Sequence, residues 1–225
     1  MLLALETAND WCSVSLYDGQ HLVAHRQDER SREQTRLILP MIDEVLLEQQ
    51  VSLKQLQAIA FSRGPGSFSG VRINSAVTQA LAWANDLPVL AVSTLQAVAQ
   101  AAYRLHQLEQ VVVVLDARMN EVYSAAYQLD GQGFMQPVAP EQLIAYTQFK
   151  FPTINNFAPV LVGSGSLLVA LDEQLKRYPE IQATSMDVAT LGFAALQAGQ
   201  TLKAHEALPV YLRENAWKKI AEQGG

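Results

Sequence analysis

The chain carries the same order of three short strands twice, and this repetition limits its possible folds more than any other feature. In the first copy, Cys12, Val14 and Leu16 alternate with polar residues, and an Asp18-Gly19 pair follows. A period of two predicts a half-buried strand, and Asp-Gly predicts a hairpin turn. The expected strands are residues 2–6, 12–16 and 21–27 in the first copy and residues 111–116, 122–129 and 134–138 in the second. The chain is therefore expected to contain an internal duplication.

Helices alternate with strands after the first triplet. Apolar side chains recur every three or four positions in residues 33–49, which is the spacing of one helix face. Ser93 is expected to cap another helix, with Gln96 completing a capping box. The expected elements are helices at 33–49, 71–85 and 94–107 and strands at 58–62 and 87–92. This order predicts an α/β fold with a mixed sheet covered on both faces.

The second copy is curtailed. After its strand triplet we expect a short helix at 140–146, a strand at 160–163 and helices at 167–178 and 187–198, the last one ended by Gly199. We divide the chain into a first lobe at 1–107, a reduced second lobe at 108–200 and a tail at 201–225 that packs back on the first lobe.

Charge and cysteine content exclude several classes of protein. The 225 residues include 16 Lys and Arg against 22 Asp and Glu, a formal net charge of −6 that provides no overall cationic field for nucleic acid. The single Cys12 excludes an intramolecular disulfide and a zinc site built from several cysteines. No apolar run approaches the roughly 18 residues of a membrane span, and the first residues lack the basic start of a signal peptide. We expect a soluble, reduced, cytoplasmic protein without membrane contact.

A glycine-rich loop, residues 63–70, joins a strand to a helix. Such a junction favours anions, because free backbone N–H groups and the helix dipole point at the loop. The spacing of the glycines fits neither a Walker A loop nor a G-x-G-x-x-G loop. The loop residues considered are Gly64, Gly66, Ser67 and Gly70. From the residues alone we prefer a tight turn that lets the helix approach the sheet.

Two acids, Glu6 and Asp116, end the first strand of each copy. Acids at equivalent strand ends can hold Mg²⁺ and a nucleotide across a cleft, but here the turns that follow contain no glycine to bring backbone amides to a phosphate. We interpret the acids as remnants of a duplicated ancestor, with the Gly163-to-Ser166 turn as a second possible nucleotide contact. His21 and His25 stand apart on a strand and are expected to be solvated, so no metal site is predicted.

The helices of the first half have more apolar surface than one sheet face can cover. Ala76, Ala80 and Ala84 form a seam of small side chains that would let another helix approach closely. We interpret these surfaces as an interface with a second chain; the alternative is cover from the chain's own C-terminal segment. The residues predicted to contact the partner are Leu37, Met41 and Val45 on one helix and Arg72, Ile73, Ala76, Val77 and Ala80 on the other.

Several segments together resemble the bacterial TsaB (YeaZ) family. They are Leu3-Ala4-Leu5-Glu6-Thr7, residues 63–73, residues 116–123 and Pro209-Val210-Tyr211-Leu212-Arg213. The resemblance spans nearly the whole chain. It implies an actin-like/Hsp70-like ATPase (ribonuclease H-like) fold with a reduced second lobe. Close relatives often have His where this chain has Gln34 and Asp where it has Glu6.

The resemblance also implies a role in forming N6-threonylcarbamoyladenosine at position 37 of tRNA. This role is that of a non-catalytic scaffold that pairs with the transferase TsaD, together with the ATPase TsaE, and that forms a homodimer in isolation. It implies contact with tRNA only through the complex, no cofactor required by this chain, and ATP or ADP at the partner interface. The alternative is an ATP-dependent small-molecule kinase of the same fold that uses Asp116.

Overall fold

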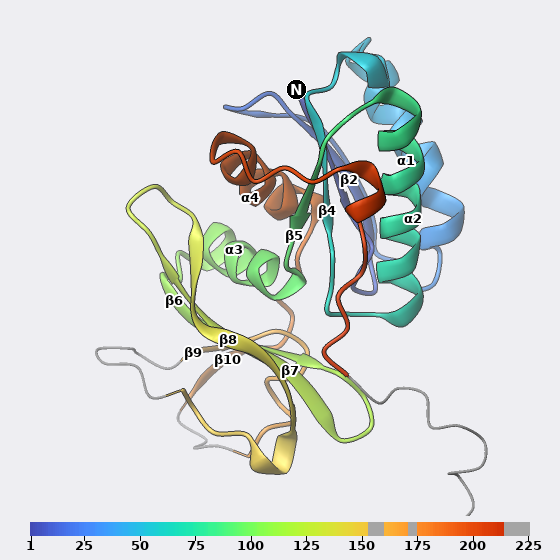
Figure 1. Cartoon of the computed structure of the whole chain (residues 1–225). Helices are drawn as coiled ribbons and strands as arrows, with labels where there is room; N and C mark the ends of the chain where they lie inside the picture. Colours follow the sequence, from blue (N-terminus) through green and yellow to red (C-terminus); the bar gives the residue numbers. More distant parts are fainter. Residues whose placement is uncertain (153–159, 171–174, 214–225) are drawn as a thin grey trace, which may run out of the picture.

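Two five-stranded mixed sheets make up most of the computed structural model, which describes residues 1–152, 160–170 and 175–213 (Figure 1). The first sheet contains β1 (Leu2–Glu6), β2 (Cys12–Tyr17), β3 (Leu22–Asp28), β4 (Ala58–Ser62) and β5 (Val89–Val92). The second contains β6 (Gln110–Asp116), β7 (Glu121–Leu129), β8 (Met135–Ala145), β9 (Val160–Val162) and β10 (Lys176–Tyr178). The helices are α1 (Gln34–Glu48), α2 (Phe68–Asn85), α3 (Thr94–His106) and α4 (Ser185–Gln197), with short 3₁₀ turns at Leu53–Gln55, Tyr146–Gln148 and Ala204–Glu206.

The two sheets have the same strand order. The first runs β3-β2-β1-β4-β5, and the second runs β8-β7-β6-β9-β10. In each, the hairpin-linked triplet is antiparallel, and the last two strands add in parallel beside the first strand. The predicted duplication is thus present, and it extends beyond the triplet to both parallel strands. The predicted α/β fold class is confirmed.

The sheets and helices form alternating layers (Figure 1). Helices α1 and α2 cover one face of the first sheet, while α3 and α4 lie between the two sheets and share one apolar core with both. The far face of the second sheet is covered by Phe149 and Val169. Residues 111–114 of β6 are four valines because this strand is buried on both faces. No helix among the described residues has the length and apolar character needed to cross a membrane.

Helix α4 comes from late in the sequence but packs on the first sheet, against β1, β2, β4 and β5. Gly192 allows this contact, since a Cβ there would come within 2.5 Å of the Ala60 Cβ. The segment after α4 also returns to the first sheet, where Leu202 and Val89 exchange two backbone hydrogen bonds of 2.9 Å. In space, α4 therefore belongs with the first sheet, while the division of the chain at residues 107 and 200 stays a prediction.

Several local expectations about secondary structure were wrong. β2 is fully buried up to Leu16 instead of half-buried, because it lies between β1 and β3 with helices on both faces. Residues 140–145 are not helical; β8 continues to Ala145, which pairs with Glu121 of β7, and a short 3₁₀ turn begins only at Tyr146. The helix expected at 167–178 is absent from the described part of that range, where turns lead to the short strand β10.

The helix boundaries agree better with the sequence pattern. α2 begins at Phe68, three residues earlier than expected, because the Ser67 hydroxyl accepts the Gly70 N–H. Ser93 caps α3 as predicted. The capping box there is only half formed, since the Gln96 side chain donates instead to the carbonyl oxygen of Met135 at 2.8 Å.

A methyl group at Gly192 should destabilise the protein although alanine favours helices. We expect Gly192→Ala to lower the free energy of unfolding by about 1–3 kcal/mol through overpacking against Ala60. Urea denaturation followed by circular dichroism measures this change. Gly131→Ala is the matched control, because a Cβ at Gly131 meets no atom within 4 Å. Equal stability of the two variants would show that α4 does not need this close approach.

Candidate functional site

The glycine loop packs against the turn that follows β1. A Cβ on Gly66 would overlap the carbonyl oxygen of Ala8, and a Cβ on Gly70 would overlap that of Thr7. The Ser67 N–H donates to the Ala8 carbonyl at 2.7 Å, and the Thr7 hydroxyl donates to the Gly70 carbonyl at 2.8 Å. These two glycines therefore make room for a neighbouring backbone. This geometry supports the tight-turn interpretation over an anion-binding loop.

Glu6 is completely buried beside this loop. Its Oε1 accepts the Ala8 N–H at 2.6 Å, while its Oε2 has no well-formed hydrogen bond among the described residues. Burial raises the pKa of the Glu6 carboxyl to about 7, although the nearby Ser62 hydroxyl and the amides of Ala8 and Asn9 lower it. A carboxyl group in this position offers no oxygen to a ligand in solution. Glu6 is thus part of the packed interior.

Asn74 of α2 lies in the same interior and joins three elements. Its side-chain amide donates to the Leu5 carbonyl at 3.2 Å, the Ser62 carbonyl at 3.0 Å and the Ser62 hydroxyl at 2.8 Å. Gln34 performs a similar task at the start of α1, where its amide donates to the carbonyls of Asn9 and Asp10 at 3.1 Å each. Asn74 therefore ties α2 to β1 and β4, and Gln34 ties α1 to the turn after β1.

Asp116 occupies the equivalent strand end in the second sheet and is partly exposed. It forms an ion pair of 2.9 Å with Arg118 and accepts the Arg118 N–H at 2.8 Å. A Cβ on Gly163 or Gly165 would come within 2.8 Å of the β6 backbone, so these glycines also serve close packing. Because Glu6 is buried, the two acids do not present carboxylates to a common opening.

The described residues contain no group of three or more His, Cys, Asp or Glu placed to hold a metal ion. His21 is exposed beside Asp18, as expected for a solvated histidine. His25 is half-buried instead, with Nδ1 2.9 Å from the Ser15 hydroxyl, because β3 lies against the N-terminal end of α4. Burial lowers the pKa of His25, which keeps the ring in its neutral form.

The predicted partner contacts divide into exposed and buried groups. On α2, Ala76 and Ala80 are exposed, and the remaining three predicted contacts, Arg72, Ile73 and Val77, are partly buried. On α1, Leu37 is partly buried, whereas Met41 and Val45 lie in the core of this chain, with Val45 0% exposed. Met41 and Val45 therefore offer no surface to a partner. The apolar side chains that α1 does expose are Leu39 and Leu47.

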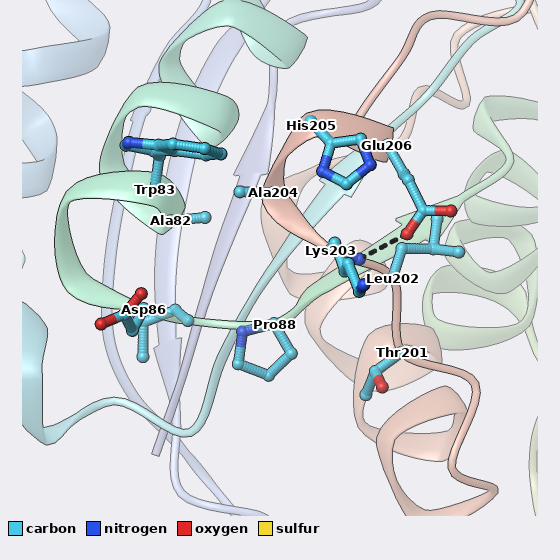
Figure 2. A pocket seen from close by; sticks show the side chains of 11 residues that line it. Ala82, Trp83, Asp86, Pro88, Thr201, Leu202, Lys203, Ala204, His205 and Glu206 are labelled. Carbon is cyan, nitrogen blue, oxygen red and sulfur yellow. Dashed lines mark hydrogen bonds between the residues drawn. The ribbon is translucent and has the colours of Figure 1, made fainter.

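Trp83 of α2 is a feature that the sequence analysis missed. The residue is 72% exposed and lines two hollows, of about 720 and 390 Å³, between α2 and residues 201–206; Figure 2 shows the larger one. Small side chains line both hollows, with Ala82 in the larger, Ala76 and Ala80 in the smaller, and Ala204 in both. A search for large exposed residues on the alanine seam could have found Trp83. The wall contributed by residues 201–206 agrees with the alternative considered above, in which the chain's own C-terminal segment covers part of this helix, although no local pattern showed which residues it would meet.

An aromatic and cationic cluster lies at the other end of α2. The Arg72 guanidinium carbon lies 3.2 Å from the centroid of the Phe68 ring and 5.1 Å from that of the Tyr211 ring. Val210, which precedes Tyr211 in the chain, donates its N–H to the carbonyl oxygen of the loop residue Arg63 at 2.8 Å. The glycine loop and the C-terminal segment, which both carried the sequence resemblance, thus meet in space.

The duplicated sheet order defines an α/β protein of the actin-like/Hsp70-like ATPase fold. The sequence profile of TsaD, tRNA N6-adenosine threonylcarbamoyltransferase, matches residues 26–219. The tRNA threonylcarbamoyladenosine biosynthesis protein TsaB of Haemophilus influenzae is 39% identical over 97% of this chain and 96% of its own length. Its Escherichia coli counterpart is 34% identical over 97% of both chains. A Pseudomonas aeruginosa structure described as similar to peptidase YeaZ is 36% identical, covers 94% of this chain and 99% of that chain, and superposes with a TM-score of 0.88. This chain belongs to the TsaB (YeaZ) family.

The buried Glu6 carboxyl should make stability depend on pH. Its pKa is raised from 4.5 to about 7 in the folded protein, so the folded state binds more protons than the unfolded state between these values. Stability should therefore fall as pH rises from 5 to 8, by an amount of the order of 3 kcal/mol. Glu6→Gln should remove most of this slope in urea denaturation at several pH values. Glu29→Gln, an exposed surface change, is the control, and an unchanged slope in Glu6→Gln would contradict the assignment.

Proposed function

We propose that this chain is a non-catalytic scaffold subunit in the formation of N6-threonylcarbamoyladenosine at position 37 of tRNA. Membership of the TsaB family supports the pathway. The main structural support for a scaffold is that the described polar residues nearest the expected nucleotide site are used for packing. Glu6 is buried, and carbonyl oxygens of the turn after β1 occupy the space that side chains at positions 66 and 70 would need. Asp116 is paired with Arg118.

The exposed face of α2 is the proposed docking surface. Ala76, Ala80 and Ala84 are exposed along one side of the helix, where small side chains let a second helix approach closely. Trp83 stands beside them with open space on both sides, and exposed tryptophans of this kind commonly dominate binding energy. A partner helix would fill the hollows and bury the indole ring.

The transferase TsaD is the proposed partner. This chain matches the TsaD sequence profile over most of its length, so the two proteins share a fold and can pair through equivalent helices. Two copies of the same surface can pair around a twofold axis when that surface is self-complementary. The exposed face of α2 would therefore also support a homodimer when the chain is isolated from TsaD. We extend the proposal to the ATPase TsaE, to ATP or ADP at the partner interface, and to tRNA reached only through the complex.

A positive charge in the alanine seam should break the complex. We expect Ala76→Arg to weaken TsaD binding at least about tenfold, because the guanidinium prevents close approach of the helices and becomes buried without a partner. Size-exclusion co-elution and titration calorimetry measure the loss. Ala198→Arg, an equally exposed change at the end of α4, is the matched control. Co-elution of a folded Ala76→Arg variant with TsaD would show that the seam is not the interface.

Depletion of this chain should lower threonylcarbamoyladenosine in bulk tRNA, measured by nucleoside mass spectrometry. Wild-type protein and Asp116→Asn should both restore the nucleoside, since a scaffold needs no catalytic carboxylate there, whereas Ala76→Arg should not. A normal nucleoside level in depleted cells would contradict the pathway. Failure of Asp116→Asn to restore it, while TsaD binding persists, would favour the ATP-dependent kinase alternative.

A further inference from the structure

The last described segment of the chain forms a strap, residues 201–213, that touches both sheets (Figure 1). It begins at the edge of β5, where Leu202 pairs with Val89. It then passes α2 and reaches the glycine loop, where the Val210 N–H donates to the Arg63 carbonyl at 2.8 Å. From there the strap continues to the second sheet and meets the turn between β6 and β7.

The β6–β7 turn has an unusual backbone. Three consecutive residues, none of them glycine, have φ values of 61°, 54° and 64°: Arg118, Met119 and Asn120. The left-handed region costs roughly 1–2 kcal/mol for a residue such as Arg or Met, while Asn enters it more readily. Such a turn persists only where its neighbours hold it in place. Several contacts come from the second sheet and the turn itself: Asp116 pairs with Arg118, and the Ala117 N–H donates to the Glu121 carbonyl at 3.0 Å. The backbone N–H and the hydroxyl of Tyr146 donate to the carbonyl and the side chain of Asn120 at 3.1 and 2.9 Å.

The strap adds a second set of contacts to the turn. The Arg213 guanidinium donates to the carbonyl oxygen of Ala117 at 3.1 Å and pairs with the Glu121 carboxylate at 2.5 Å, so it spans the two ends of the turn. It also contacts the Met119 sulfur. The Arg213–Glu121 pair is mostly shielded from water, with side-chain exposures of 20% and 33%. Shielding strengthens the pair relative to one on the open surface.

The same strap also contacts the outer surface of α2. Tyr211, two residues before Arg213, stacks on the Arg72 guanidinium, which lies over Phe68. Phe68 and Tyr211 are 53% and 49% exposed, so a partner seated on this end of α2 would meet both rings. A three-residue stretch therefore connects the proposed docking surface to the strained turn of the other sheet.

We propose that residues 211–213 act as a latch that couples partner binding on α2 to the β6–β7 turn. This inference rests on the proposed function, because it describes how the α2 docking surface is regulated. When Tyr211 contacts Arg72 and Arg213 pairs with Glu121, the turn is closed and the strap is tied to α2 and to the second sheet. A partner that binds the latched form more tightly holds the turn closed, and by linkage a broken latch weakens the partner's binding.

The first test uses the free chain. The N–H groups of Ala117 and Glu121 are hydrogen-bonded within the turn, so their exchange with solvent reports its opening. We expect Arg213→Ala to speed hydrogen exchange at these two amides at least about tenfold. Arg30→Ala, which changes an exposed arginine paired with Asp28 at the end of β3, is the matched control. Unchanged exchange in Arg213→Ala would show that the strap does not hold the turn.

The second test adds TsaD. We expect TsaD to slow exchange at Ala117 and Glu121 in the wild type, and Arg213→Ala to bind TsaD about three- to tenfold more weakly without that slowing. In Tyr211→Ala, which keeps the Arg213–Glu121 pair, TsaD should also fail to slow hydrogen exchange at Ala117 and Glu121. This variant takes the place of Arg213→Ala if Arg213→Ala does not fold. Wild-type affinity in Arg213→Ala, or persistent slowing there, would overturn the coupling while leaving the docking proposal intact. If wild-type protein does not bind TsaD, the proposed function fails, and the free-chain exchange still decides whether the latch exists.

Discussion

The position of α2 depends on one contact between two backbones, the turn after β1 and the loop before the helix. Gly66 and Gly70 let the loop lie directly on the carbonyls of Ala8 and Thr7. Any side chain at these glycines would push the start of the helix away from the sheet. The buried Asn74 would then lose its three hydrogen bonds, and the exposed alanines of α2 would shift together with the helix. An internal packing constraint thus sets the shape of the external surface.

The two sheets show how the same strand position acquires different chemistry. Glu6 and Asp116 both end the first strand of their sheet, but α2 and the glycine loop cover Glu6. The described residues of the second copy place no helix between β9 and β10, where α2 lies in the first copy. Asp116 therefore stays partly exposed and pairs with Arg118. Loss of a covering helix, more than any change of the acid itself, separates the two sites.

The sequence predicted the elements whose pattern is local. The strand triplets, α1 and α3 were all recognisable because apolar spacing and the Ser93 cap operate over a few residues. The second half of β8 was mistaken for a short helix because its pairing with β7, not its own composition, extends the strand to Ala145. Pro140 is tolerated there because β8 is an edge strand.

The candidate site was predicted less completely, for a related reason. Periodicity marked the apolar positions of α1 but not which of them face the sheet, so Val45 was assigned to the surface although it belongs to the core. The Trp83 groove and the Arg213 contacts join segments about a hundred residues apart in sequence. No local pattern reports such a contact. The family resemblance identified the correct segments without showing that they meet.

The origin of α4 late in the chain has a consequence for synthesis on the ribosome. Helix α4 covers the face of the first sheet opposite α1 and α2. Two hydrogen bonds hold its start: the Ser185 N–H donates to the Ser13 hydroxyl, and the Asn9 side-chain amide donates to the Ala183 carbonyl. Until residue 197 emerges, the apolar face around Ala60 and Leu2 has no cover from α4. Domains generally fold from the N-terminus as they are made, but here α4 can cover the first sheet only after nearly the entire chain has been synthesised. The nascent protein therefore exposes part of the apolar face of its first sheet until late in translation.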